Sequence, residues 1–548
     1  MNAGLGLLHS LKMNEKENRS GTLKQNLESL SPFELSLYLE KSVEAQKESK
    51  EWLNAGRGNP NWTAPIPREA FFLLGEFATR ETHIANKDML GTMVKESSGR
   101  EERFEAFLET KESAGAKLLE QIWNKGQHLL GMPREKWLTD MLDHTIGDNY
   151  PHPERVLQAS EEPIKQYLHH ELFSSNSVPF DIFAVEGGTA GIVYTFKSLV
   201  NNHLLEPKDK IALMIPTFAP YLEIPELPEY GFDVEYIRSE LMDIDGQTSY
   251  QFKEEELDRL RNNAIKAVFV VNPSNPTANA IYDSSIDQLK DIVETDNPDL
   301  MILSDDVYGT FLNKFTSLFT ALPYNTACIY SYSKYFGATG WRIGTIALAK
   351  DNVFNRLLKE LPEDKKEALN KRYESITSNP SSLSFIDRMV ADSRSVALNH
   401  AAGLSAPQQV MMTLFSLYAL LDKEDIYKKE VMQICHKRGD LLYKSLGLTM
   451  PVEELNTAYY CEIDFDWWMK KRYGSEFRDY VETNWTMTDI VAQLAQEERL
   501  NLLKSEAFGS SRWTVRVSLA NLETEAYAEV GERIASMMDR MHTEWLTQ

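Results

Sequence analysis

The stretch of sequence that decides the fold runs from residue 299 to residue 344 and reads DLMILSDDVYGTFLNKFTSLFTALPYNTACIYSYSKYFGATGWRIG. Two apolar runs, DLMILS and ACIYSY, are each followed by polar or small residues. Runs of this kind are typical of strands buried on both faces, and strand–helix alternation predicts a mainly parallel sheet. Ligands of such sheets bind at the carboxyl ends of the strands. The residues that follow each run are therefore the candidate site.

The same alternation of apolar runs with polar or small residues continues on both sides of this stretch. Further β-rich runs between residues 180 and 350 are DIFAVEGG, KIALMIP, DVEYIR, AIKAVFVVNP and GTIALA. Together they predict an α/β domain around a mainly parallel sheet. Near the C-terminus, YYCEIDF, LNLLKSEAFG and WTVRVSLA are strand candidates of a smaller α+β domain.

Changes in the pattern of apolar and charged residues divide the chain into three parts. Residues 1–150 are predicted to hold an N-terminal arm and part of the small domain, with a solvated helical pair at 95–120. Residues 151–400 form the predicted large domain, including a charged helical insert at 351–400. Residues 401–548 complete the small domain.

Composition excludes several classes of partner. The 548 residues hold 58 Lys+Arg against 82 Asp+Glu, a net charge of −24. Such a chain is a poor binder of nucleic acid or of an anionic membrane surface. No apolar run is long enough to span a bilayer.

The cysteines and the N-terminus indicate the compartment. Cys328, Cys435 and Cys461 are far apart and form no CxxC pair, which argues against a disulfide framework or a structural metal site. The first residues lack a basic start and a cleavage site, and they are interpreted as a loose arm. We therefore expect a cytoplasmic protein without a metal.

Lys334 is the centre of the candidate chemistry. It lies in a loop rich in glycine and aromatic residues, directly after a predicted buried strand. Desolvation and nearby cations lower the pKa of such an amine, which can then form Schiff bases. Arg342 follows eight residues later and can hold a phosphate bidentately. Ser331 and Lys334 also satisfy the S-x-x-K pattern of penicilloyl-serine hydrolases, but the S-D-N and K-T-G motifs are missing.

Other polar residues follow the remaining strands. Asp305 can pair with a ring nitrogen, although Asp306 beside it is a rival for that role. Tyr308 can donate to a phenolate oxygen. Asn275 lies between two proline-fixed turns and is either a rigid amide donor or only a turn former.

Two further segments complete the constellation. The sequence EGGTAG (186–191) ends one strand and opens a helix, so its N–H groups and Thr189 can cradle an anion. Phe218 ends another strand and offers a flat surface to a heteroaromatic ring, or is simple core. A phosphate cradle, a stacking ring, a ring-nitrogen partner, phenolate donors and a Schiff-base lysine together describe pyridoxal 5′-phosphate (PLP).

At this level the sequence resembles fold-type I PLP enzymes of the aspartate aminotransferase superfamily. The resemblance is carried by NPSNPT, SDDVYG and SYSKYFGATGWRIG and extends from about Ala55 to Leu519. It implies a large domain with a seven-stranded type of sheet. It implies these roles: Lys334 as Schiff-base lysine, Asp305 as pyridine-nitrogen partner, Asn275 and Tyr308 as O3′ donors, Gly188, Thr189, Ser331 and Arg342 as phosphate ligands, and Phe218 as stacking ring.

Two more positions are carried over from this resemblance. Tyr150, in GDNYPHP, is similar to the tyrosine that reaches the phosphate of the neighbouring subunit, which implies a homodimer. Arg516, in WTVRVSLA, is similar to the arginine that clamps the substrate α-carboxylate, with Arg512 as its rival.

A narrower resemblance concerns bacterial aspartate 4-decarboxylases. It rests on GRGNPNW, EGGTAG, PTFAPYLEIPE, NHAAGLSAPQQ and the length of the chain. It implies conversion of L-aspartate to L-alanine and CO2, a side aminotransferase activity with α-keto acids, and oligomers larger than a dimer. Arg57 replaces the small or hydrophobic residue usual in plain aminotransferases. It is a candidate catalytic and substrate-binding residue, or a loop-surface arginine.

One arginine that aspartate aminotransferases use is missing from this sequence, and its absence has a physical explanation. We find no counterpart of the neighbouring-subunit arginine that holds the side-chain carboxylate in aspartate aminotransferases. A tight salt bridge to that carboxylate would stabilise the ground state and oppose its loss as CO2. One alternative is an aminotransferase with little decarboxylation. Another is a cofactor-binding module of a regulator, which the acidic net charge of the chain argues against.

Overall fold

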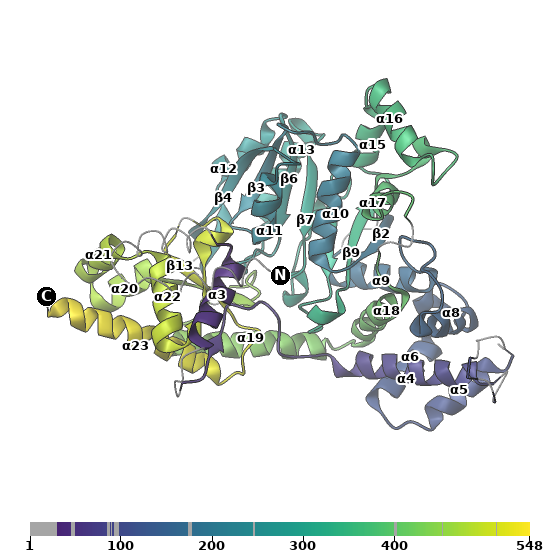
Figure 1. The fold of residues 1–548 in the computed structure, drawn as a ribbon, viewed down its shortest axis with the longest axis horizontal. Helices are drawn as coiled ribbons and strands as arrows, with labels where there is room; N and C mark the ends of the chain where they lie inside the picture. The colour runs from purple at the N-terminus through teal and green to yellow at the C-terminus, as the bar shows by residue number, and fades with distance from the viewer. Residues whose placement is uncertain are drawn as a thin grey trace, which may run out of the picture.

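The computed structural model describes residues 30–44, 50–84, 88, 90–91, 98–173, 178–244, 247–398, 403–451, 453–510 and 512–547. The interpretation of the first 29 residues as a loose arm lies outside this part of the chain. Figure 1 shows two lobes, one around a large sheet and one formed mostly by the C-terminal residues.

In the described part of the chain, the large lobe contains a sheet of eight strands. Their spatial order is β2 (Phe180–Val185), β9 (Gly344–Ala349), β8 (Thr326–Ser331), β7 (Met301–Asp305), β6 (Ile265–Val271), β3 (Lys210–Ile215), β4 (Asp233–Ile244) and β5 (Gln247–Phe252). The neighbours from β8 to β4 are parallel, and β9 runs antiparallel to both β2 and β8. The predicted α/β fold is confirmed, and β5 extends the expected sheet as an antiparallel hairpin with β4.

Both faces of this sheet are buried, which explains the continuous apolar runs. Ala267, Phe269 and Val271 of β6 pack with α10 (Gly188–Asn201), α15 (Val353–Glu360) and α17 (Phe385–Ser393). Val268 and Val270 of the same strand pack on the other face with α12 (Glu254–Asp258), α13 (Asp283–Thr295) and α14 (Leu318–Ala321). From Ala267 to Val271 both faces of the strand are therefore apolar.

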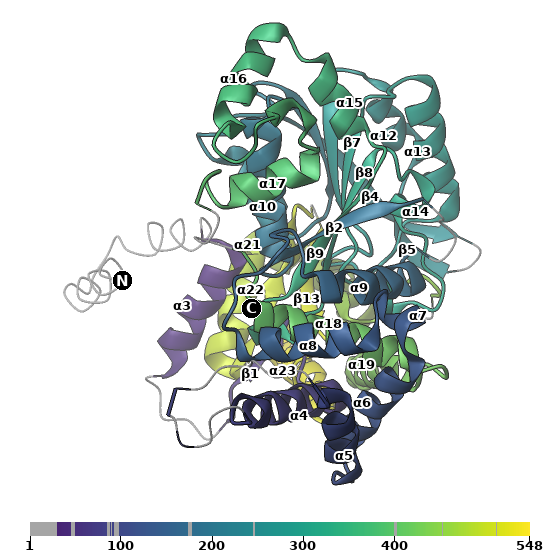
Figure 2. The same cartoon turned by 90° about the vertical axis from the view of Figure 1, so that its right-hand side faces the viewer.

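A third cluster covers β2, β8 and β9 with helices from both halves of the sequence. These helices are α4 (Pro65–Thr82), α5 (Arg100–Glu109), α6 (Ala114–Lys125), α7 (Gln127–Leu130), α8 (Arg134–Ile146), α9 (Gln158–Glu171) and α18 (Ala406–Leu421). The expected solvated helical pair is wrong, because Phe104 and Phe107 of α5 and Ile122 and Trp123 of α6 are buried in this cluster. Figure 2 shows α5 and α16 (Glu363–Tyr373) at opposite ends of the molecule.

The small lobe has its own core, which includes Leu35, Leu39, Leu53 and Ala55 from the N-terminal part of the chain. The strand β1 (Leu53–Asn54) pairs in parallel with β11 (Leu500–Asn501), and β10 (Tyr460–Asp464), β13 (Thr514–Ser518) and β12 (Leu503–Lys504) form an antiparallel sheet. Its helices are α3 (Pro32–Glu44), α19 (Ile426–Ser445), α20 (Phe465–Tyr473), α21 (Ser475–Asn484), α22 (Met487–Glu498) and α23 (Ala526–Leu546). The first 150 residues therefore serve two clusters, and the predicted boundaries at 150 and 400 stay a prediction.

Candidate functional site

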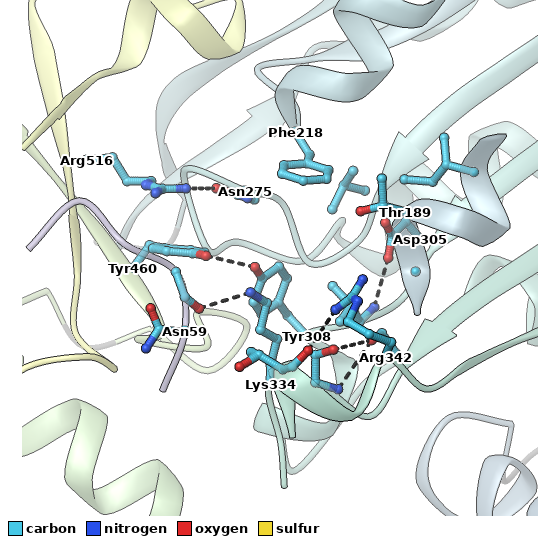
Figure 3. Close-up of a pocket in the computed structure, with 18 residues that line it drawn as sticks. Asn59, Thr189, Phe218, Asn275, Asp305, Tyr308, Lys334, Arg342, Tyr460 and Arg516 are labelled. Carbon is cyan, nitrogen blue, oxygen red and sulfur yellow. Dashed lines mark hydrogen bonds between the residues drawn. The ribbon is translucent and has the colours of Figure 1, made fainter. Parts of the chain in front are cut away.

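A pocket lies at the carboxyl edge of the sheet, where the two lobes meet (Figure 3). Its volume is about 260 Å³. The side chains of Lys334, Tyr308 and Tyr460 point toward one another, and Arg516 lies beyond them with Asn275. The lining residues are Gly58, Asn59, Gly188, Thr189, Ile192, Phe218, Val271, Asn275, Asp305, Val307, Tyr308, Ser331, Ser333, Lys334, Thr339, Arg342, Tyr460 and Arg516.

Lys334 enters the pocket from the loop after β8. Its Nζ donates to the carbonyl oxygen of Gly58 at 3.0 Å, which joins the large lobe to the N-terminal segment of the small one. Burial lowers the pKa of the Lys334 amine, and the charges of Arg516 and Arg342 lower it further, while Tyr460 and Asp305 act in the opposite sense. The neutral, nucleophilic form of this amine is therefore easier to reach than that of an exposed lysine.

Asp305 is the last residue of β7 and is 5% exposed. The hydroxyl of Tyr221 donates to its Oδ2 at 3.4 Å, and the N–H of Val307 donates to its Oδ1 at 3.3 Å. Burial raises the pKa of the Asp305 carboxyl to about 7. A carboxyl of this kind can hold or release a proton near neutral pH.

Its neighbour Asp306 does not line the pocket. The Asp306 carboxylate accepts hydrogen bonds from the hydroxyls of Ser304 and Ser317, and the residue has no exposed surface. The geometry therefore favours Asp305 over Asp306 as the group that faces a ligand.

The opposite end of the pocket suits an anion. The helix α10 begins at Gly188, and Gly187 before it has a φ of +88°. A Cβ on Gly187 would lie 2.6 Å from Nη2 of Arg342, so only glycine lets the guanidinium approach this backbone. Helix N-terminal N–H groups beside a guanidinium form an anion site, and Thr189 and Ser331 line the same end. A phosphate fits these residues.

Arg516 marks the end formed by the small lobe. Its Nη1 donates to Oδ1 of Asn275 at 2.8 Å, and its Nη2 donates to the carbonyl of Gly56 at 2.6 Å. The residue is 1% exposed, and its buried Nε has no hydrogen-bond partner. A buried guanidinium with spare donors suits a carboxylate. The rival Arg512 instead pairs with Asp464 outside the pocket lining.

Two aromatic residues predicted from the sequence also line the pocket. Tyr308 is 3% exposed, and burial raises the pKa of its hydroxyl well above the usual value, so it stays protonated at neutral pH. Phe218 precedes α11 (Ala219–Glu223) and presents its ring to the cavity (Figure 3). Both side chains thus line the pocket, and their roles as stacking ring and phenol donor stay predictions.

Two predicted residues lie outside the pocket lining. Arg57 is exposed, and its guanidinium forms an ion pair with Glu40 of α3 at 3.1 Å. Tyr150 lies in the loop before α9 and is 68% exposed. Their roles toward the substrate and toward a neighbouring subunit stay predictions.

Sequence reasoning missed several residues around the pocket. Tyr460 and Asn59 line it from the small lobe, and Tyr221 reaches Asp305 from behind. Tyr460 could have been predicted, because it lies in the expected strand YYCEIDF, and that strand is adjacent in the small domain to the strand that carries Arg516. What the sequence lacked was the register, which pairs Tyr460 with Ser518 and Glu462 with Arg516.

The described residues show no cluster of histidine, cysteine, aspartate and glutamate that could hold a metal ion. Within the same residues, no helix is long and apolar enough to cross a membrane.

The fold and the pocket define a class of protein. A mainly parallel sheet carries, at one edge, residues that suit an anion, a cavity, a buried carboxyl with a raised pKa and a lysine with a lowered pKa. These are the features of a fold-type I PLP enzyme.

Comparison with known proteins specifies the family. Residues 148–534 match the family of class I and II aminotransferases. A bifunctional aspartate aminotransferase and L-aspartate β-decarboxylase of a Pseudomonas species is 43% identical over 529 residues, which is 95% of this chain and 98% of that protein. The chain therefore belongs to the class I and II aminotransferase family, whose cofactor is PLP.

Solved structures show the same fold. Aspartate aminotransferase from Thermus thermophilus with maleate has a TM-score of 0.55 at 16% identity, over 96% of this chain and 100% of that one. An aromatic aminotransferase from Pyrococcus horikoshii has a TM-score of 0.55 at 16% identity, over 92% of this chain and 99% of that one.

Proposed function

We propose that the chain is a PLP-dependent aspartate 4-decarboxylase. It removes the side-chain carboxyl of L-aspartate as CO2 and releases L-alanine, and as a side activity it passes the amino group to an α-keto acid. The observation that carries this proposal is the 43% identity to the bifunctional relative across 95% of the chain. That identity spans both lobes that form the pocket.

The chain's own residues divide the work between the two ends of the pocket. Bound PLP supplies a conjugated ring that takes up the electron pairs left when bonds to the substrate carbons break. In our proposal the N-terminus of α10, Thr189, Ser331 and Arg342 hold its phosphate, and Phe218 covers its ring. Asp305 holds a proton at the ring nitrogen, and Tyr308 and Asn275 donate to the phenolate oxygen.

Lys334 is the proposed proton carrier. Its lowered pKa leaves a larger unprotonated fraction at neutral pH than an exposed lysine has. Once substrate occupies the pocket, Nζ can accept the α-proton and return it to a carbon on the same side.

Arg516 is the proposed clamp of the α-carboxylate. Among the pocket-lining residues that the structure describes, the cations are Lys334, Arg342 and Arg516. With Arg342 at the phosphate end and Lys334 engaged in proton transfer, Arg516 remains for a dicarboxylate substrate. It can hold one carboxylate tightly, which leaves the other outside a tight ion pair. That arrangement favours loss of the second carboxylate, because a tight pair would stabilise the ground state.

The second candidate is an aspartate aminotransferase with little decarboxylation, which family membership itself supports. Supplying L-aspartate with and without an α-keto acid separates the two. A decarboxylase forms alanine and CO2 in equal amounts without sustained need of the keto acid. A plain aminotransferase forms oxaloacetate, stops when the acceptor is omitted, and releases no stoichiometric CO2.

We also propose at least a homodimer, assembled further into a larger homo-oligomer, in the cytoplasm. The exposed position of Tyr150 supports contact with a second subunit. Cys328, Cys435 and Cys461 are free and buried, as expected in a reducing compartment. Sedimentation of the holoenzyme tests the assembly.

A further inference from the structure

Tyr460 occupies the junction of the pocket's main elements. It is the first residue of β10, it is 2% exposed, and it lines the cavity from the small lobe. Its hydroxyl faces the large lobe, and its ring faces Arg516 (Figure 3). One side chain thus contacts the proposed phenol donor and the proposed carboxylate clamp.

The hydroxyl of Tyr460 forms a hydrogen bond with the hydroxyl of Tyr308, with 2.9 Å between the two oxygens. Either oxygen can be the donor in the free chain. When the Tyr308 hydroxyl donates its hydrogen bond to a phenolate oxygen, its oxygen can only accept a hydrogen bond from Tyr460. Tyr460 must then be the donor, and a hydroxyl that accepts one hydrogen bond becomes a stronger donor in the next.

The ring of Tyr460 holds the guanidinium of Arg516. The Arg516 Cζ lies 4.3 Å from the centroid of Tyr460 and 4.8 Å from that of Phe508. Cation–π contact on two rings fixes the plane of the guanidinium and therefore the direction of its donors. This contact needs the ring and not the hydroxyl.

A third segment fixes the position of the hydroxyl. A Cβ on Gly58 would lie 2.5 Å from Oη of Tyr460 and 3.5 Å from Nζ of Lys334. The carbonyl of the same glycine accepts from Lys334 and from the hydroxyl of Tyr459, at 3.0 and 2.8 Å. The backbone at Gly58 thus packs directly against Tyr460 and leaves its hydroxyl little freedom.

We propose that Tyr460 is a positioning residue with two separable effects: its hydroxyl strengthens the hydrogen bond that Tyr308 gives to the cofactor's phenolate oxygen, and its ring orients Arg516 for the substrate carboxylate. This inference rests on the proposed PLP site. The first effect changes the bound cofactor itself, and the second changes the binding of substrate.

The first test uses the visible absorbance of PLP bound to Lys334, titrated with pH in the purified holoenzyme without substrate. A hydrogen bond to the phenolate oxygen is stronger after the neighbouring proton has left, so it lowers the pKa of the chromophore. Tyr460→Phe is expected to raise that pKa by up to about one unit, and Tyr308→Phe by more. Tyr527→Phe is the matched control, because it removes a buried hydroxyl of the small lobe that donates to the Ser518 carbonyl. It should leave the chromophore pKa unchanged.

The outcomes separate the two levels of the proposal. If the wild-type chain forms no lysine-bound absorbance with PLP, the proposed function fails. If the band forms and Tyr460→Phe titrates like wild type, or Tyr308→Phe does not raise the pKa, the relay through Tyr308 is refuted. An equal shift in Tyr527→Phe would overturn it as well, because a general loosening of the lobe would then explain the effect.

The second test measures the affinity of a non-reacting dicarboxylate, such as maleate, from its effect on the same absorbance. Tyr460→Phe keeps the ring and should bind within about twofold of wild type, whereas Tyr460→Leu should bind roughly tenfold more weakly. Equal affinities of the Phe and Leu variants would refute the role of the ring.

Discussion

At the scale of single residues, Asp305 and Asp306 show how surroundings set the chemistry of identical side chains. Both are buried, and burial raises the pKa of each, to about 7 for Asp305 and about 6 for Asp306. Asp306 is satisfied by two serine hydroxyls, whereas Asp305 faces the cavity with weaker partners. The carboxyl that the protein satisfies less well is the one available to a ligand.

Replacing Asp305 should stabilise the cofactor-free chain in alkaline solution. The folded carboxyl keeps its proton up to pH about 7, whereas an unfolded one loses it near 3.8. The folded state therefore binds more protons in this window, and its stability falls as the pH rises through it. Asp305→Asn should remove up to about 4 kcal/mol of this penalty above pH 7 and change little below pH 4.

Denaturant unfolding of the cofactor-free protein at acidic and alkaline pH measures this difference. Asp306→Asn is the matched comparison. The pKa of Asp306 is raised only to about 6, and the substitution also deprives one serine hydroxyl of its acceptor, so its alkaline gain should be clearly smaller than that of Asp305→Asn. An Asp305→Asn variant with no alkaline gain would contradict the assigned pKa.

Exchange of Arg516 for Lys should weaken substrate recognition far more than the same exchange at Arg512. Lysine keeps the charge but loses the planar fork that holds Asn275 and a carboxylate together. We expect kcat/KM for aspartate to fall roughly 100-fold in Arg516→Lys. Arg512→Lys should stay within about threefold, since Arg512 pairs with Asp464 outside the pocket. Similar losses in both variants would mean that the clamp has been misassigned.

At the scale of elements, the helical insert contacts the helix whose N-terminus forms the proposed phosphate site. Asp392 of α17 is 1% exposed and accepts hydrogen bonds from Ser198 and Asn202, the last turn of α10 and its cap, and from Tyr373 and Arg372. The other end of α10 is the anion cradle. The insert therefore anchors the helix that forms the cradle.

Removing this anchor should destabilise the large lobe. Asp392→Ala leaves a guanidinium and several polar groups without their partner, which costs about 3 kcal/mol. Chemical denaturation of Asp392→Ala beside Asp364→Ala, an exposed carboxylate in the first turn of α16, measures the difference. The Asp364 variant should remain within about 0.5 kcal/mol of wild type. Equal stability of the two variants would contradict the anchor.

Arg57 either binds the substrate or stays in a surface ion pair, and two variants separate these roles. Arg57 pairs with Glu40 at the surface, and such a pair contributes about 0–1 kcal/mol. If Arg57 leaves this pair to bind substrate, Arg57→Gln raises KM for aspartate, and Glu40→Gln keeps KM equal or lowers it. Steady-state kinetics of the two variants decide between the roles. A matching small change in stability with unchanged KM in both would leave Arg57 as a surface residue.

The elements predicted from sequence were those whose signal is local. The apolar runs of β2, β3, β6, β7, β8 and β9 predict strands because both faces are buried in helices. β5 was not predicted, since QTSYQF is polar and pairs only at the edge of the sheet. The buried face of α6 was missed because its charged neighbours dominate the composition.

The residues of the site likewise divide into those with a local signal in the sequence and those without one. Asp305 ends the parallel strand β7, and Asn275 and Lys334 follow the ends of β6 and β8, so their convergence is predictable from a parallel sheet. Arg342 lies in the connection from β8 to the antiparallel strand β9. Tyr460 and Gly58 reach the pocket through pairing within the small lobe and the approach of the two lobes. Contacts between segments hundreds of residues apart leave no local pattern in one sequence.

At the scale of the whole molecule, an acidic coat surrounds a cationic pocket. The chain carries a net charge of −24, yet Lys334, Arg342 and Arg516 line one cavity. PLP and aspartate are both anions, so the pocket must differ in sign from the surface. The buried position of Arg516 also protects its charge from screening by salt.

The most direct test of the account uses L-aspartate isotopically labelled in its side-chain carboxyl, mixed with the PLP-loaded protein. We predict that the label leaves as CO2 and that unlabelled L-alanine appears in equal amount. Aspartate labelled in the α-carboxyl should keep its label in alanine. Label retained in oxaloacetate, with neither CO2 nor alanine formed, would contradict the proposed decarboxylation and leave an aminotransferase.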